Sequence, residues 1–266
     1  MATGSLQVNR DIILATRRQH LKQQMKSTPL DAVLALAQMQ NRPRSILNYS
    51  NNKREISLFA QVTRHEIYDP VTSALHCLVN GADGIAFFTD HSIYHHDLDD
   101  LLIVARAMPT TPVIYQNYML GEYDVMAARA SDASALMFYS NLIDQQALRQ
   151  VVSMAQRWKM MTIVQVSHED DLEYALTLSP HAIAFGDNLS KNISASVDNL
   201  MAVQNSLPHY SKIFLTHALH TIEDVILALT VNVDALIVDE SLLKNERTAS
   251  AIRELINDAE KRRAIK

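Results

Sequence analysis

Four ionisable side chains stand directly after short apolar runs, at positions where parallel strands would end. Asp187 follows AIAFG, His217 follows KIFLT, and Asp239 and Glu240 follow ALIV. A histidine with nearby carboxylates can serve as a general base or as a divalent metal site, because imidazole titrates near neutral pH and both groups ligate cations. The alternative is that these are solvated loop residues, since chain order alone does not make side chains converge.

Other histidines give weaker patterns. His65 follows another apolar run and would lie at the same rim. His91, His95 and His96 precede Asp97 in a polar segment. Their loose spacing favours surface histidines over a metal site, because ligation requires a defined geometry. We expect no resident metal and no cofactor.

The elements that would position these residues alternate strictly after residue 55. Nearly continuous apolar runs of six to seven residues are followed by stretches with helical spacing. Such runs are typical of parallel strands that are covered on both faces. The expected strands are 56–62, 84–90, 111–117, 135–140, 162–167, 182–187, 212–217 and 235–240.

The helices between these runs have readable starts. Asp69 precedes Pro70, and Thr221 with Asp224 resembles a capping box. Eight strand–helix units predict a single α/β domain, 1–266, with the fold of a (β/α)8 TIM barrel. The main alternative is an open doubly wound sheet, but no G-x-G-x-x-G follows the first strand.

Residues 1–55 precede the barrel. Within them, 11–26 and 28–41 predict two helices joined at Pro29. No linker rich in Pro, Gly or Ser separates this N-terminal helical extension from the barrel at 56–266, so we expect the two parts to pack together.

Composition limits the class of protein. The formal net charge is −5 and the pI is about 6.1, which argues against a nucleic-acid partner. No apolar run approaches the ~18 residues of a membrane span, and the N-terminus lacks the apolar core of a signal peptide. The single cysteine, Cys77, fits a reducing compartment. We therefore expect a soluble, cytoplasmic protein.

Five glycines are few, since average usage would give about 19. Phosphate-binding barrels use glycines in the loops after the last strands, where backbone N–H groups approach the ligand. This sequence has almost none for that purpose.

Several segments, in order, resemble indole-3-glycerol-phosphate synthase, which closes the indole ring in tryptophan biosynthesis and releases carbon dioxide and water. The resemblance begins with two N-terminal helices, PRSIL and ISLFAQVTR, and continues through FFTD, PVIYQNYMLGEYDV and IVQVSHEDDLEYAL to VDALIVDESLL. It covers nearly the whole chain. It implies a (β/α)8 barrel with an active site at the C-terminal ends of the strands.

The positions that the resemblance assigns to acid–base chemistry differ here. Gln61 and Thr63 replace a glutamate and an essential lysine of the first strand. Gln116 replaces the lysine that acts as general acid, and Gln165 replaces the catalytic glutamate of the fifth strand. The segment 64–69 is also shorter than the family's mobile Ser-Pro-Ser loop and contains no serine.

The substrate positions after the last three strands differ as well. The family's Asn-Asn-Arg corresponds to Gly186, Asp187 and Asn188, and its Glu-Ser-Gly corresponds to Thr216, His217 and Ala218. Its phosphate-binding glycine corresponds to Asp239, which Glu240 follows. Glutamine and threonine do not titrate in the useful range, and an ionised Asp239 would repel a phosphate dianion.

The sequence therefore predicts a family member that has lost the ring-closing reaction and acts by binding a small molecule or a protein partner, with no nucleic acid and no membrane involved. Two alternatives remain. One is an enzyme with a rebuilt active site that uses His217 with Asp187 and Asp239. The other is an atypical carboxy-lyase of tryptophan biosynthesis.

Overall fold

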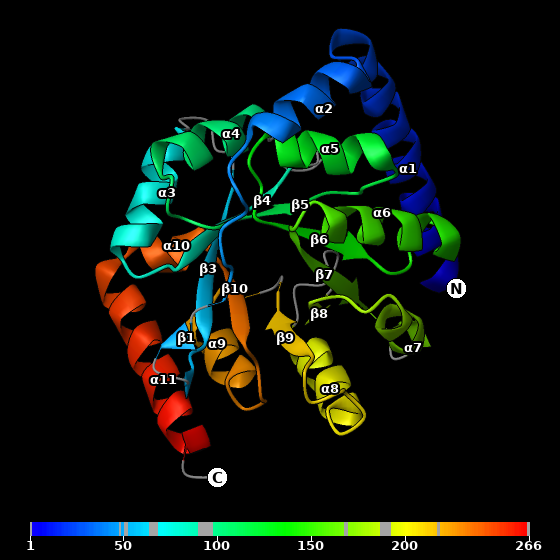
Figure 1. Ribbon diagram of the computed structural model, residues 1–266. Helices are drawn as coiled ribbons and strands as arrows, with labels where there is room; N and C mark the ends of the chain where they lie inside the picture. Colours follow the sequence, from blue (N-terminus) through cyan, green and yellow to red (C-terminus); the bar gives the residue numbers. More distant parts are fainter. Residues whose placement is uncertain are drawn as a thin grey trace.

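Eight parallel strands close into one barrel in the order β10-β3-β4-β5-β6-β7-β8-β9 (Figure 1). The computed structural model describes residues 2–47, 49–50, 53–63, 69–89, 98–167, 170–186, 193–216 and 219–264. The strands are β3 (Ser57–Val62), β4 (Gly84–Phe88), β5 (Val113–Gln116), β6 (Ala135–Tyr139), β7 (Met161–Val166), β8 (Ala182–Phe185), β9 (Lys212–Leu215) and β10 (Ala235–Asp239). The predicted barrel and all eight predicted strands are confirmed.

Helices follow the strands and form the outer layer. They are α3 (Pro70–Val79), α4 (Leu98–Ala107), α5 (Glu122–Ala130), α6 (Gln145–Arg157), α7 (Asp170–Thr177), α8 (Ile193–Val203), α9 (Ile222–Ala228) and α11 (Glu246–Ala264). Both predicted caps are confirmed. The Asp69 carboxylate accepts from the backbone of Val71 and Thr72, and the Thr221 hydroxyl accepts from the Asp224 N–H at 3.1 Å.

One short helix, α10 (Glu240–Lys244), lies between β10 and α11. The sequence pattern placed Glu240 at the end of the last strand, which was wrong. The Asp239 carboxylate accepts a hydrogen bond from the Ser241 N–H at 2.9 Å, so it caps a helix that begins at Glu240.

The N-terminal extension consists of α1 (Ala2–Ser27) and α2 (Leu30–Met39), followed by a two-stranded ribbon, β1 (Tyr49–Ser50) and β2 (Lys53–Arg54). The first helix begins at Ala2 rather than at Asp11. Residues 2–10 have no apolar periodicity from which a helix could be predicted. The helix extends through them because each residue added to an existing helix gains one backbone hydrogen bond. Figure 1 shows α1 running beside α5 and α6, on the side of the molecule away from α11.

The inside of the barrel is packed with side chains. Phe59 and Phe214 stack with ring centroids 6.2 Å apart, and Ile46 packs with the same interior cluster from the segment before β3. Small and large side chains alternate from strand to strand in this cluster, so that layers contributed by alternate strands fill the space. The cluster comprises Ile46, Phe59, Ala86, Ile114, Ala135, Met137, Ile163, Ala182, Ala184, Phe214, Ala235 and Ile237. No described helix is long and apolar enough to cross a membrane.

Candidate functional site

The interior cluster determines which residues face inward at the C-terminal ends of the strands. Successive side chains of a strand point to opposite faces, so a residue two positions after an interior residue also faces inward. Counting two residues on from the last interior residue of each strand gives one inward-facing position at each C-terminal strand end. These positions are Gln61, Phe88, Gln116, Tyr139, Gln165, Gly186, Thr216 and Asp239.

Three of the positions expected from the sequence lie next to one another at the ends of β7, β8 and β9. Gln165 donates a hydrogen bond from Nε2 to the Gly186 carbonyl at 2.7 Å, and Gly186 lies against Thr216. Gln116, on β5, is fully buried, and its Nε2 lies 3.5 Å from Met137 Sδ. These positions carry neutral amides and a hydroxyl, which bind by hydrogen bonds but exchange no proton near neutral pH.

Gly186 lies where the ends of β8 and β9 approach each other closely. A Cβ added there would lie 2.2 Å from the Thr216 carbonyl oxygen, which is a backbone atom and cannot rotate away. The glycine is therefore required by the close approach of the β8 end to the β9 end.

Gly186→Ala is expected to lower the free energy of unfolding by about 1–3 kcal/mol or more, because the strand ends must separate. Chemical denaturation of the purified variant measures this. Gly121→Ala is the matched control, since a Cβ at Gly121 meets no atom within 4 Å. The control is expected to lose less than about 1 kcal/mol, at the level of a helix N-cap change. Equal losses in the two variants would contradict the proposed clash.

The first strand brings Gln61 and Thr63 to the same end, both half-buried. Gln61 pairs in register with Asp239 across the seam that closes the barrel. The Thr63 N–H donates to Glu240 Oε1 at 3.2 Å. The end of β3 is therefore paired with β10 and hydrogen-bonded to the first residue of α10.

The two acids after β10 have structural partners. Asp239 caps α10, and its second oxygen lies 3.6 Å from His220 Nδ1. Glu240 is 1% exposed, accepts from Thr63, and lies 3.2 Å from Lys244 Nζ. The family resemblance assigns phosphate binding to this region, and here the Asp239 carboxylate caps the start of the short helix. A phosphate would compete with that carboxylate and be repelled by it.

Several residues singled out in the sequence lie outside the described residues. They are Asp187, Asn188, His217, Ala218, His65, His91, His95, His96 and Asp97. The histidine-based site therefore stays a prediction. Within the described ranges, no three His, Cys, Asp or Glu side chains are grouped so that they could hold a metal ion.

Two further polar groups near these strands are buried in their neutral forms. Burial raises the pKa of the Cys77 thiol to about 12, and the nearby Glu240 carboxylate adds to the shift. Burial also raises the pKa of Tyr115, which is fully enclosed on the outward side of β5. Neither group is therefore a nucleophilic anion at neutral pH.

An aromatic cluster at the barrel mouth was not anticipated from the sequence. Phe88, Tyr118 and Tyr139 form a triangle with ring centroids 5.3 to 6.2 Å apart, and Leu14 of α1 packs on it. Phe88 and Tyr139 are inward positions of β4 and β6, so strand alternation could have found them. The contact of Leu14 with this cluster could not be predicted, because the residues it touches are far away in the sequence.

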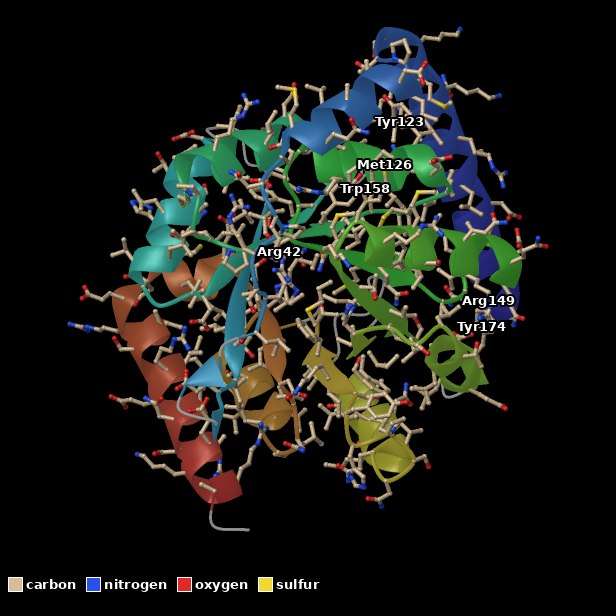
Figure 2. All side chains as sticks on the ribbon, in the orientation of Figure 1. Arg42, Tyr123, Met126, Arg149, Trp158 and Tyr174 are labelled. Carbon is tan, nitrogen blue, oxygen red and sulfur yellow. The ribbon has the colours of Figure 1, made fainter. Side chains whose placement is uncertain are left out.

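Helix α1 is fixed to this end of the barrel by polar contacts. Arg17 forms a buried ion pair with Asp124 of α5 and donates from Nε to the Tyr118 carbonyl. Tyr123 lies on the side of α5 toward the N-terminal helices (Figure 2), and its hydroxyl donates to the carbonyls of Gln24 and Thr28. The helix therefore covers the ends of β4, β5 and β6.

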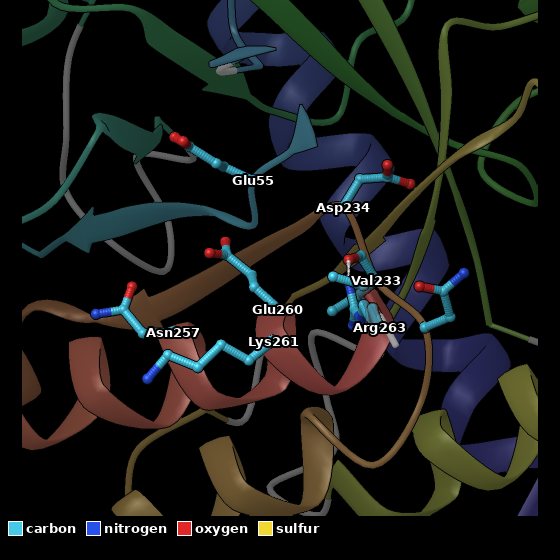
Figure 3. Close-up of a pocket in the computed structure, with 9 residues that line it drawn as sticks. Glu55, Val233, Asp234, Asn257, Glu260, Lys261 and Arg263 are labelled. Atoms are coloured by element: carbon cyan, nitrogen blue, oxygen red, sulfur yellow. Dashed lines mark hydrogen bonds between the residues drawn. The ribbon is translucent and has the colours of Figure 1, made fainter. Parts of the chain in front are cut away.

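An open depression of about 580 Å³ lies at the opposite end of the barrel, where β10 begins (Figure 3). Two of its charged side chains bind backbone groups. Arg263 donates to the carbonyls of Val231 and Val233, and Glu260 accepts from the Ile56 N–H. In barrels of this class the N-terminal face serves stability, so the candidate site remains at the other end.

Solved structures confirm the fold. The 3-hexulose-6-phosphate synthase of Salmonella typhimurium superposes with a TM-score of 0.63 at 12% identity, covering 76% of this chain and 97% of that one. A thiamine phosphate pyrophosphorylase from Pyrococcus furiosus gives a TM-score of 0.58 at 13% identity, covering 79% and 99%.

Sequence comparison identifies the family. The chain is 22% identical over 260 residues to an indole-3-glycerol phosphate synthase of Dichelobacter nodosus, covering 92% of this chain and 96% of that protein. It is 25% identical over 258 residues to one from a Roseiflexus species, covering 91% and 96%. The family model for indole-3-glycerol phosphate synthase matches residues 10–255, so the chain belongs to this family.

Proposed function

We propose that this family member does not close the indole ring and instead binds a ligand at the C-terminal end of its barrel. The observation that carries the proposal is the chemistry of the inward positions. Where the family resemblance expects a lysine and a glutamate on β5 and β7, Gln116 and Gln165 are buried, and the Gln165 amide is used in a hydrogen bond to Gly186.

The loss has a large kinetic consequence. A positioned acid or base contributes about 10²–10⁴-fold to a reaction rate, so two lost groups remove about 10⁴-fold or more. The occupied cap at Asp239 adds to this, because it removes the family's place for a phosphate. The same cap role counts against an enzyme rebuilt around Asp239, since that carboxylate already has structural partners.

Purified protein incubated with the synthase substrate is expected to form indole-3-glycerol phosphate at least about 10⁴-fold more slowly than the Dichelobacter nodosus relative assayed beside it. Indole fluorescence follows the product. A rate within about 100-fold of the relative would overturn the proposal, because one missing group would then account for the whole difference.

A further inference from the structure

Two buried polar atoms face the inside of the barrel without a hydrogen-bond partner among the described residues. They are Gln116 Oε1, on β5, and Thr216 Oγ1, directly after β9. Both residues are 0% exposed. A buried acceptor or hydroxyl without a partner is uncommon in native proteins, because burial removes the water that would otherwise bind it. A ligand long enough to reach from the end of β5 to the end of β9 would satisfy both atoms.

Gln116 has an open polar end whichever way its amide is turned. Its Nε2 contacts only the thioether of Met137 at 3.5 Å within the described chain, and a thioether is a weak acceptor. Asn117 Oδ1 and Ser140 Oγ also have no partner there, but these residues are on the outward-facing set of their strands. The inward pair is therefore the one that points to a ligand.

The two atoms lie at the ends of an arc of inward positions. Tyr139, Gln165 and Gly186 lie between them at the ends of β6, β7 and β8, and Gln165 donates a hydrogen bond to the Gly186 carbonyl. The arc offers amide, hydroxyl and carbonyl groups beside one aromatic ring. Protein groups that donate and accept hydrogen bonds suit a ligand whose own groups do both. Hydroxyl groups of a ligand have this property.

Charge sets a second condition on the ligand. The described inward positions at these strand ends include no lysine or arginine. Two described cations at this end of the barrel are already paired, Arg17 with Asp124 and Lys244 with Glu240. Asp239, on β10, is the one described inward carboxylate at these strand ends. An anionic ligand would therefore find no free countercharge among the described inward positions, and burial of an unpaired charge is strongly unfavourable.

From these observations, and resting on the proposed function, we propose that this end of the barrel binds an uncharged polyhydroxy compound of the polyol or unphosphorylated sugar class. Its hydroxyl groups meet Gln116 Oε1 and Thr216 Oγ1. The chain would thus have replaced a site for a phosphorylated substrate with a site that recognises hydroxyls by neutral hydrogen-bonding groups.

Isothermal titration of the full chain tests the ligand class. The probes are uncharged polyols and sugars of three to six carbons, including ribitol and ribose, with ribose 5-phosphate as the charged counterpart. We expect saturable binding of at least one uncharged probe, and binding of ribose 5-phosphate at least about tenfold weaker than that of ribose. Preference for the phosphorylated sugar, or binding of no uncharged probe, would overturn the proposal.

Two nearly isosteric variants test the atoms. Gln116→Met and Thr216→Val remove the unpartnered polar atoms, so each is expected to weaken binding of the uncharged probe about tenfold or more. The melting temperature of the ligand-free variants is expected to stay level or rise, because the one hydrogen bond lost among the described residues is the weak one from Gln116 Nε2 to the Met137 thioether. Gln165→Met is the matched control and is expected to melt lower, since it loses the bond to Gly186.

A purely structural role gives the opposite result. If Gln116→Met and Thr216→Val both melt lower and the probe affinity is unchanged, an ordered water satisfies these atoms in the free protein, and the proposal fails. Turnover of the synthase substrate would sink the proposed function and this inference together. An inactive protein that prefers ribose 5-phosphate would sink this inference alone.

Discussion

Replacing Arg17 by methionine is expected to lower the free energy of unfolding by about 3–5 kcal/mol, because it leaves the Asp124 carboxylate buried without its cation. Arg17 is 5% exposed and Asp124 is 1% exposed, so water cannot replace the lost partner. The variant also loses the hydrogen bond from Nε to the Tyr118 carbonyl. Urea denaturation followed by circular dichroism measures the change.

A second substitution separates the charge from the packing. The Asp124 carboxylate accepts from the backbone N–H groups of Leu120 and Gly121 at 2.8 and 3.2 Å. The side-chain oxygen of an asparagine can accept the same two hydrogen bonds. Arg17→Met combined with Asp124→Asn is therefore expected to be about 1–3 kcal/mol more stable than Arg17→Met alone. If the second change destabilises further, the buried charge is not the source of the loss.

Restoring the family's glutamate by Gln165→Glu is expected to cost about 3–5 kcal/mol at pH 8. The Gln165 Nε2 donates to the Gly186 carbonyl at 2.7 Å, and a carboxylate oxygen in its place would face that carbonyl with no proton between them. The charge would also be buried at a position that is 2% exposed. Thermal and urea unfolding of the variant beside the unaltered protein measures the cost.

The cost depends on pH in a defined direction. Burial and the facing carbonyl raise the folded-state pKa of the new carboxyl above its unfolded value of about 4.3. Below pH ~4.3 both states are protonated and the charge penalty is absent. As pH rises toward the raised folded-state pKa, the folded state holds more protons than the unfolded state, so relative stability falls. Gln165→Met is the control and is expected to lose about 1–3 kcal/mol at every pH. A pH-independent loss in Gln165→Glu would exclude a buried charge.

The fold was predictable because it repeats one local pattern. Each strand is a continuous apolar run, and caps such as Asp69 and Thr221 fix helix starts through groups three residues away or fewer. The family resemblance added the order of the segments along the chain. One of these segments is PRSIL, whose Arg44 binds the Asp132 carboxylate at 2.7 Å. The start of α1 and the short α10 were missed, because neither has an apolar period of its own.

The site was predictable only in part. Strand ends and the family resemblance were enough to select Gln116, Gln165 and Thr216, but their partners depend on distances across the barrel. The sequence placed Asp239 and Glu240 together at the barrel rim, as candidates for a site with His217 or as solvated loop residues. In the structure one caps a helix and the other contacts Thr63 and Lys244. Leu14 and Arg17 contact residues between β4 and β6, which are far from α1 in the sequence, so no local pattern reveals these contacts.

The seam between β3 and β10 has a consequence for how this chain comes to be folded during synthesis. Gln61 pairs with Asp239, so the first strand of the barrel keeps an unpaired edge until the last strand has left the ribosome. Contacts this distant are slow to form, because the entropy of closing a long loop is lost before they are gained. Partly made chains would therefore carry two open strand edges, which are templates for aggregation. Production of this protein should depend on chaperone capacity more than its final stability would suggest.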